Sequence, residues 1–592
     1  MKRKLLLAFF ALLLTLLWGC GEAAAVDTRI QISLVAGDGY TVENNGLWVE
    51  PGADAEFVLE MKKGVSLQEV DYEGQYDHRL EDGKLYLTLK SVQYPERVRL
   101  FTTTRYCTIT YDANGGEGQL IVKTYGLSYH KRPNTETGQK LFQRPDHSLV
   151  SWNTKPDGSG LRVGLGSRVT TGPELTLYAQ WMEWSPVEDF KYSVSQYGKV
   201  TINKYLGNQE TVVIPERIEG YPVTHIAANA FRDSALRHIV LTRNVDVVAP
   251  DAFTGSALET VTLFDNIQEI TDSAFVNCEN LRTLYINAIE APYGYEFRRE
   301  SVYADKVDML ILAKGQPKMI FYAGCSAWYN LNGEDTHKVF GDEYKIINMA
   351  INGTVNSSAQ MQIMTPYLEA GDILIHTPEL SSQYQLMYNV SMGNNDDKLW
   401  CGLEYNYDLF TLVDLRTVPG AFDSLALYLD KKTTQSSYNA CYLDDDGNEY
   451  LDAFGCVPFL RNTTKSRLSD NIRLDPSYIT DEGMARLEAF YNLYRSKGVR
   501  VYVSHACVNM DEVPEDQRGN VELMDGLFRD AFEAIEGVKV ISRLEDYLYT
   551  SNDFYDTNFH LLSESARENT ALWIRDIRAQ LVKDGLWEGE NE

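Results

Sequence analysis

Two short segments in the second half of the chain hold the side chains needed for nucleophilic chemistry on esters. Ser326 follows a glycine and a cysteine at the end of the apolar run 319–323, where a tight turn after a strand would expose a serine hydroxyl. Asp556 and His560 lie one helical turn apart near the carboxyl end, a spacing at which two side chains can hydrogen-bond. Together the three residues predict a triad in which histidine takes the serine proton and aspartate orients the histidine.

Residues 300–592 resemble the SGNH or GDSL hydrolases, and within them the acyl esterases and acyltransferases of surface glycans. The stretch MIFYAGCSAWYNLNG is similar to the family's first block, with Cys325 in its middle position, and YKIINMAINGT is similar to the second. The resemblance implies a three-layer α/β domain with a parallel sheet. It also implies Ser326 as nucleophile, His560 as general base, and the backbone N–H groups of Ser326 and Gly353 as the oxyanion donors.

Two blocks depart from the family pattern. Three residues rather than two separate Asp556 from His560, a variant that we associate with the more distant surface-glycan members. In the third block, 371–379, Glu379 stands where the family has an asparagine, and an ionised glutamate cannot donate a hydrogen bond. We therefore expect either that Asn352 or Asn356 supplies the missing donor, or that the two backbone N–H groups suffice.

Other parts of the carboxyl half predict structure rather than chemistry. His376 and His505 end apolar runs but have no acidic residue in a matching block, so we interpret them as strand-end residues. Thr480 can cap a helix that runs to Lys497, and an apolar strand follows. Alternating helices and strands predict a parallel sheet with the site at the carboxyl ends of its strands.

The amino end predicts where the protein acts. Residues 1–19 have a basic start and an apolar core, as in a secretory signal, and the ending before Cys20 resembles a bacterial lipobox. We expect cleavage before Cys20, lipidation of its thiol and an extracytoplasmic protein held on the membrane by that lipid. A net charge of −29 argues against nucleic acid as a partner.

The remaining cysteines give no metal or disulfide pattern. Seven others are scattered without a Cys-x-x-Cys pair, which indicates neither a zinc site nor a dense disulfide framework. A bridge between Cys441 and Cys456 stays open as an alternative. We expect no metal and no organic cofactor.

Two middle segments resemble modules of bacterial surface proteins. Residues 106–183, with Asn-Gly and Asp-Gly turn dipeptides and a closing aromatic strand, resemble the Listeria-Bacteroides repeat, with Trp152 and Trp181 as core residues. Farther along, Ala-Phe pairs recur every 22 residues, which predicts a short solenoid of three or so units. The sequence of these units resembles that of treponemal-type leucine-rich repeats, and the units would bind a partner or act as a rigid arm.

The sequence thus predicts a multidomain chain with two alternative functions. The first is a serine esterase or O-acyltransferase that acts on acyl (acetyl) esters of a carbohydrate polymer. The second is a non-catalytic adhesin or scaffold that binds a carbohydrate polymer or a surface protein and has a degenerate hydrolase domain. The expected parts are a lipoprotein signal peptide (1–19), a tether (20–26), a β-sandwich-like domain without recognisable chemistry (27–105), the Listeria-Bacteroides repeat (106–183), a leucine-rich-repeat solenoid (184–290) and the SGNH-like α/β domain (300–592).

Overall fold

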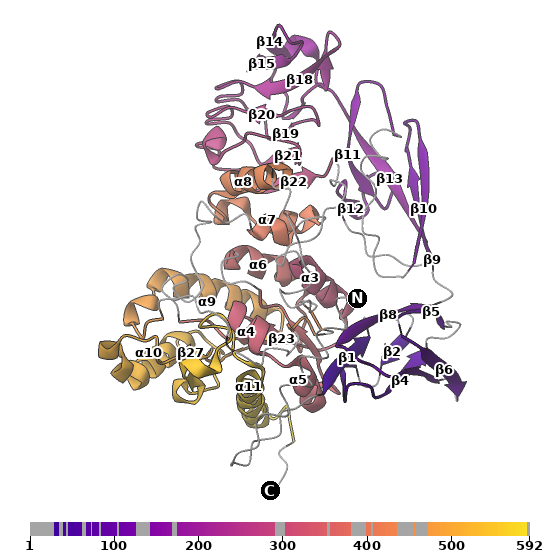
Figure 1. Cartoon of the computed structure of the whole chain (residues 1–592). Coiled ribbons are helices and arrows are strands. Elements are labelled where there is room, and N and C mark those ends of the chain that lie inside the picture. The colour runs from indigo at the N-terminus through magenta and orange to yellow at the C-terminus, as the bar shows by residue number, and fades with distance from the viewer. Residues whose placement is uncertain are drawn as a thin grey trace, which may run out of the picture.

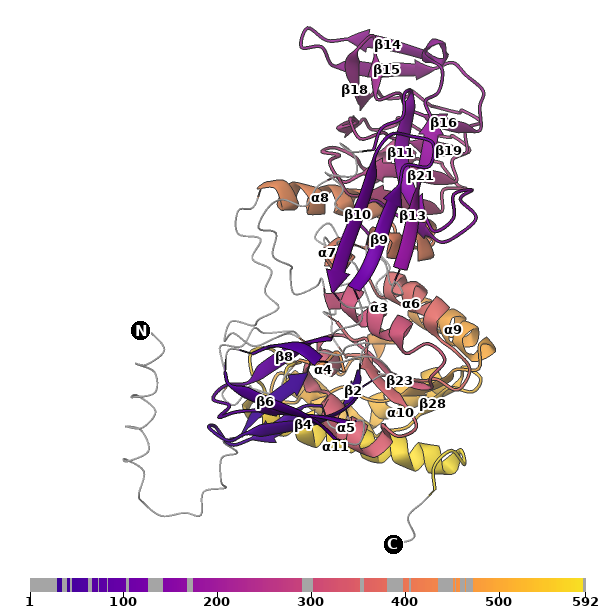
Figure 2. The same ribbon diagram turned by 90° about the vertical axis from the view of Figure 1, so that its right-hand side faces the viewer.

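The computed structural model places several β-rich units and one α/β unit side by side (Figures 1 and 2). It describes residues 29–34, 40–42, 45–61, 67–72, 74–81, 84–102, 106–125, 142–167, 174–289, 302–351, 356–380, 398–403, 406–434, 451–452, 454–457, 464 and 472–588. The predicted signal peptide and Cys20 lie outside these residues. No helix in the described part of the chain is both long and apolar enough to cross a bilayer.

Two four-stranded sheets, ordered β3-β1-β8-β5 and β2-β4-β7-β6, share one core and form the N-terminal β unit. Side chains alternate along its strands, so that Phe57 and Leu59 of β4 are buried whereas Glu56 and Glu60 are exposed. The strands are β1 (Ile30–Leu34), β2 (Tyr40–Val42), β3 (Leu47–Val49), β4 (Ala55–Met61), β5 (Leu67–Asp71), β6 (Tyr76–Glu81), β7 (Lys84–Leu89) and β8 (Glu96–Thr102).

The next unit is a five-stranded sheet ordered β10-β9-β13-β11-β12. Trp152 is buried in its core between the rings of Tyr111 and Phe142, each 4.9 Å away between centroids, and the Trp181 indole donates to the Ala113 carbonyl at 2.7 Å. Both tryptophans therefore serve the core. The strands are β9 (Tyr106–Asp112), β10 (Gln119–Tyr125), β11 (His147–Asn153), β12 (Arg162–Val163) and β13 (Glu174–Glu183).

The repeats stack as short strands, and the sheet β16-β19-β21-β22 is parallel throughout. The phenylalanines of the Ala-Phe pairs form an aromatic ladder, with centroid distances of 5.0 Å from Phe231 to Phe253 and 5.3 Å from Phe253 to Phe275. Tyr205 extends the ladder at one end, 5.3 Å from Phe231. The strands are β14 (Phe190–Val194), β15 (Val200–Tyr205), β16 (Thr211–Val213), β17 (Arg217–Ile218), β18 (Tyr221–Ile226), β19 (His238–Val240), β20 (Val247–Val248), β21 (Thr260–Phe264) and β22 (Thr283–Asn287).

The α/β unit contains a parallel five-stranded sheet ordered β24-β23-β25-β26-β28, a doubly wound order with helices on both sides (Figures 1 and 2). In such sheets ligands bind where the strand order reverses, here at the carboxyl ends of β23 and β25. The sheet strands are β23 (Lys318–Tyr322), β24 (Lys345–Asn348), β25 (Ile373–His376), β26 (Arg500–Val503) and β28 (Lys539–Val540), and β27 (Val508–Asn509) pairs separately with β29 (Leu548–Tyr549).

Helices of this unit pack on the sheet through apolar faces. The helix predicted after Thr480 is confirmed as α9, in which the Thr480 hydroxyl accepts the Gly483 N–H at 3.1 Å and Tyr491 and Tyr494 are buried. The helices are α3 (Val302–Leu312), α4 (Cys325–Asn330), α5 (Gly333–Phe340), α6 (Ser357–Met364), α7 (Lys398–Gly402), α8 (Ala421–Thr434), α9 (Asp481–Ser496), α10 (Val521–Glu533) and α11 (Ser563–Lys583).

Helix α8 covers the end of the repeat stack, where an exposed apolar face would otherwise remain (Figure 1). Phe422 of this helix adds a further ring to the ladder, 4.2 Å from Phe275. The Asp272 carboxylate of the last repeats accepts backbone N–H groups of Gly420 at 2.6 Å and of Phe422 at 2.8 Å, which caps α8. The repeats and the α/β unit consequently share one continuous core.

We expect Phe253→Ala to lower the free energy of unfolding by about 3–5 kcal/mol, because it opens a cavity in the middle of the ladder. Urea unfolding of the full chain, followed by circular dichroism, measures the change. Tyr197→Ala is the matched control, since that ring is 82% exposed at the far end of the stack and should shift stability by less than about 0.5 kcal/mol. Equal shifts for the two variants would contradict the ladder's role.

Candidate active site

Ser326 lies in the first turn of helix α4, directly after the end of β23. Its side chain is fully buried, and its hydroxyl oxygen has no hydrogen-bond partner among the described residues. Gly324 precedes the helix against the Glu379 carboxylate, where a Cβ would lie only 2.7 Å from both carboxylate oxygens. The turn therefore needs glycine at this position, and it places the serine at the strand-order reversal.

Asp556 and His560 form the pair that their spacing predicts. The His560 Nδ1 lies 2.6 Å from an Asp556 carboxylate oxygen, which identifies Nδ1 as the protonated nitrogen and leaves Nε2 for proton exchange. The loop that carries the pair is closed by an antiparallel bridge between Phe554 and Leu561. The Tyr555 N–H also donates to the His560 carbonyl at 2.8 Å. This loop, residues 554–561, is called the histidine loop below.

Helix α4 holds the histidine loop beside the serine. Tyr329 stacks its ring on His560, with 3.6 Å between centroids and 11° between planes. The Asn330 side chain donates to the Phe559 carbonyl at 2.8 Å and accepts the Leu561 N–H at 2.9 Å. Positions three and four residues after Ser326 share its side of the helix, so the structure brings the serine and the Asp–His pair to one place.

The serine hydroxyl and the histidine are not hydrogen-bonded to each other in the structure. The Ser326 hydroxyl has no partner among the described residues, so no hydrogen bond joins it to His560. Catalytic hydrogen bonds are commonly long in unliganded enzymes and shorten when substrate binds. The structure thus has the Asp556–His560 pair formed and the Ser326 hydroxyl unbonded, and the triad remains a prediction.

Glu379 contacts one of the predicted oxyanion donors. Its buried carboxylate accepts the Ser326 backbone N–H at 2.7 Å, so the N–H group assigned to the oxyanion is already engaged. Because an ionised carboxylate only accepts hydrogen bonds, Glu379 binds this N–H and offers no donor of its own at this position. Burial, together with the nearby Glu379 carboxylate, also raises the pKa of the Cys507 thiol well above its usual value.

The other candidate donors are absent from the described residues or serve another role. Asn352 and Gly353 lie outside the residues that the structure describes, so their predicted roles remain predictions. Asn356 caps helix α6, where its side-chain oxygen accepts the Ala359 N–H at 2.9 Å. Cys456 is a free thiol in the structure, and Cys441, its proposed partner, lies outside the described residues. No group of three or more His, Cys, Asp or Glu residues is placed to hold a metal ion in the described ranges.

His376 is a structural residue, as its sequence context predicted. It ends β25 and is fully buried, with Nδ1 hydrogen-bonded to the Tyr491 hydroxyl. Burial lowers the pKa of His376 to about 3, which keeps the ring neutral at physiological pH. It therefore anchors α9 to the sheet.

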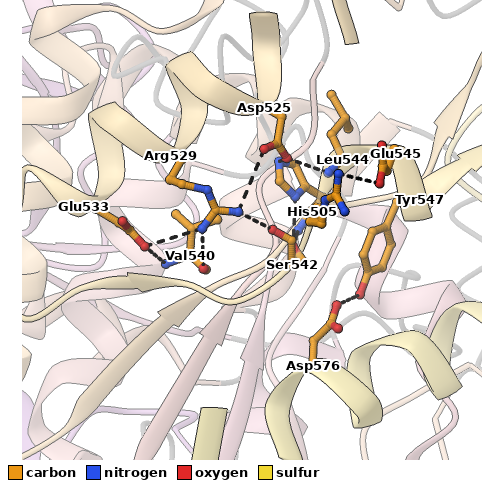
Figure 3. A network of polar contacts seen from close by, with 11 residues as sticks. His505, Asp525, Arg529, Glu533, Val540, Ser542, Leu544, Glu545, Tyr547 and Asp576 are labelled. Carbon is orange, nitrogen blue, oxygen red and sulfur yellow. Dashed lines mark hydrogen bonds and ion pairs between the residues drawn. The ribbon is translucent and has the colours of Figure 1, made fainter. Parts of the chain in front are cut away.

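His505 belongs to a second cluster of Ser, His and Asp side chains (Figure 3). The Ser542 hydroxyl accepts the His505 backbone N–H at 2.9 Å and is bonded to the ring Nδ1 at 2.8 Å, while Asp525 lies 3.6 Å from Nε2. Asp525 also accepts the Leu544 N–H at 2.6 Å, and Arg529 donates to the Ser542 carbonyl at 2.8 Å. In a catalytic triad the serine bonds Nε2 and the aspartate bonds Nδ1, whereas here the two positions are exchanged. We therefore interpret the cluster as a structural link between α10 and the sheet.

Sequence reasoning missed Tyr329 and Asn330, which position the histidine loop. Both lie in the block quoted above, three and four residues after Ser326, and helical spacing alone places them on its side. The contact of Glu379 with the Ser326 N–H had no such signal, because 53 residues separate the two.

Comparisons with known proteins concern the repeats. Residues 205–302 match the family of BspA type leucine-rich repeat regions in six copies, so this part of the chain contains such repeats. Among solved structures, a leucine-rich repeat protein of T. pallidum matches with 23% identity and a TM-score of 0.12, over 17% of this chain and 71% of its own. No curated protein gives a match. The match confirms the predicted leucine-rich repeats.

Burial of His505 makes stability depend on pH. Burial lowers the pKa of His505 to about 4, whereas the unfolded chain binds this proton near pH 6.5. Its contribution to stability is therefore complete above about pH 6.5 and is lost as the pH falls towards 4. We expect His505→Gln, although less stable at neutral pH, to lose about 3 kcal/mol less of its free energy of unfolding over that range.

Urea unfolding of both proteins at a series of pH values measures this difference. His78→Gln, at an exposed position of β6, is the control and should keep the wild-type pH dependence. Equal acid slopes for His505→Gln and the wild type would contradict the assignment of His505 as a buried neutral ring.

Proposed function

We propose that the chain is a serine hydrolase of the SGNH type that removes or transfers acyl groups, acetyl in particular, on a carbohydrate polymer. The observation that carries the proposal is the pair formed by His560 Nδ1 and an Asp556 carboxylate oxygen, 2.6 Å apart, held against helix α4, which carries Ser326 in its first turn. A buried hydroxyl without a partner, beside a histidine oriented by a carboxylate, is the arrangement that activates a serine. The strand order and the serine's place at its reversal support the family resemblance.

In the proposed mechanism Ser326 attacks the ester carbonyl while His560 Nε2 takes the hydroxyl proton. The tetrahedral intermediate collapses when His560 returns that proton to the departing sugar hydroxyl, which leaves an acyl-serine. Water or a second hydroxyl then attacks the acyl-serine by the same route in reverse. Asp556 stabilises the imidazolium that forms in each half.

The surface setting is part of the proposal. The lipobox-like ending before Cys20 supports a lipid anchor, and surface-type repeats fit a protein displayed outside the membrane. The repeats would hold the hydrolase away from the membrane or bind a glycan or protein partner.

A second candidate is a non-catalytic scaffold, favoured by one observation. The Glu379 carboxylate occupies the Ser326 N–H, and a negative oxygen there opposes the negative charge of an oxyanion. An active enzyme must move this carboxylate or protonate it, whereas a scaffold can keep it in place.

We expect Ser326→Ala to abolish hydrolysis of 4-nitrophenyl acetate and of an acetylated oligosaccharide. Asp556→Asn should lower kcat by about 10³–10⁴, because His560 then adopts the wrong tautomer. Ser542→Ala is the matched control, since Ser542 is also a buried serine at a strand end beside a histidine but lies outside the proposed triad. Its folded fraction should keep wild-type turnover. Full activity in folded Ser326→Ala would reject the proposed function and favour the scaffold.

We expect Glu379→Gln to raise kcat about tenfold or more, because an amide carries no negative charge to repel the oxyanion and its NH₂ group can donate a hydrogen bond to it. Initial rates with the same acetate substrates measure the change. Glu536→Gln, at a fully solvated carboxylate, serves as the control. A lower kcat in Glu379→Gln would show instead that the carboxylate itself is needed for turnover.

A further inference from the structure

We propose that the N-terminal β unit completes the hydrolase site, with Trp48 of β3 as a positioning residue for the histidine loop. This inference rests on the proposed function, which it extends to a segment of the chain without recognisable chemistry of its own. The N-terminal β unit lies beside α5 and α11 in both views of the molecule (Figures 1 and 2).

Trp48 points away from the core of its own unit. Its neighbours Leu47 and Val49 pack against that core, and alternation along a strand sends the residue between them to the other face. Strand β3 is at the edge of its sheet, so a large apolar side chain here would be exposed if the unit were alone. The tryptophan therefore serves a contact with another part of the chain.

That contact is with the α/β unit and has a polar and a cationic component. The Trp48 indole N–H donates to Glu334 of α5 at 3.1 Å, and the Gln31 side chain reaches the same carboxylate oxygen at 3.4 Å. The Arg567 guanidinium of α11 lies 4.7 Å from the centre of the indole ring. These contacts fix the indole on the two helices.

The apolar component reaches the histidine loop itself. Trp48 packs against a small cluster formed by Cys507, Phe554, Leu561 and Ala566, separate from the large core of the α/β unit. Phe554 and Leu561 are the two residues whose bridge closes the histidine loop, and both are fully buried. Trp48 thus packs against the cluster that includes the closure of the loop carrying Asp556 and His560.

Loss of the indole would loosen the closure of the histidine loop, although Trp48 itself does not contact substrate. Phe554 and Leu561 would lose packing partners, and the His560 ring would sample positions away from Ser326. A histidine misplaced by about 1 Å lowers the rate of the chemical step about a hundredfold, whereas substrate binding does not depend on it. The expected signature is a fall in kcat with KM unchanged.

The test uses the full chain and compares Trp48→Ala with Trp48→Phe. We expect Trp48→Ala to lower kcat for 4-nitrophenyl acetate at least tenfold with KM within twofold, and Trp48→Phe, which keeps an aromatic ring in the cluster, to restore most of the rate. Tyr94→Ala is the control, because Tyr94 is 53% exposed in the same unit, and it should leave both constants unchanged. A wild-type kcat in Trp48→Ala would overturn the proposal.

Hydrogen exchange followed by mass spectrometry separates this inference from the proposed function. In Trp48→Ala we expect faster exchange confined to residues 554–561 and the other residues of the small cluster, whether or not the protein turns over an ester. Unchanged exchange in this segment would overturn the positioning role, and so would faster exchange throughout the α/β unit, which would indicate general destabilisation. If Ser326→Ala stays active while 554–561 exchange faster in Trp48→Ala, the function fails but the contact stands.

Discussion

The side chain of Asn330 joins two parts of the chain that are more than 220 residues apart, and the site depends on that junction. The side-chain amide N–H and the side-chain oxygen of Asn330 each form a hydrogen bond with the backbone of the histidine loop. The backbone carbonyl of Asn330 accepts the Thr570 hydroxyl of α11 at 2.9 Å. All of these groups are buried, so losing the side chain would leave polar groups unsatisfied, at a cost of about 1–3 kcal/mol each. The junction explains how helix α4, which carries Ser326, and the histidine loop near the carboxyl end come together.

Side-chain contacts join the β units and the repeats to the α/β unit. Phe422 and Asp272 join the repeats to the α/β unit, and Trp48 joins the N-terminal β unit to the histidine loop. Arg162 of the second β unit is ion-paired with Asp408, beside the end of the repeats. Of these contacts, that of Trp48 links a segment without recognisable chemistry of its own to the loop that carries Asp556 and His560.

Local patterns predicted several elements of the fold and the hydrogen bond between Asp556 and His560. The structure has a strand at the apolar run before Ser326, a helix after the cap at Thr480 and an aromatic ladder at the recurring Ala-Phe pairs. Each of these patterns depends on contacts within a few residues or between neighbouring repeats. Contacts between distant segments could not be predicted in this way. Glu379 reaches the Ser326 N–H, and Phe422 covers the repeats, only because tertiary packing brings distant segments together.

The most direct test of the account is covalent labelling of the folded full-length protein with an aryl fluorophosphonate, followed by peptide mapping. The account predicts one phosphonyl group per chain, on the hydroxyl of Ser326, since this is the serine beside the Asp556–His560 pair. It predicts no label on Ser542, whose hydroxyl is held by the backbone and ring of His505. A folded protein that takes up no label, or takes it up elsewhere, would contradict the central claim.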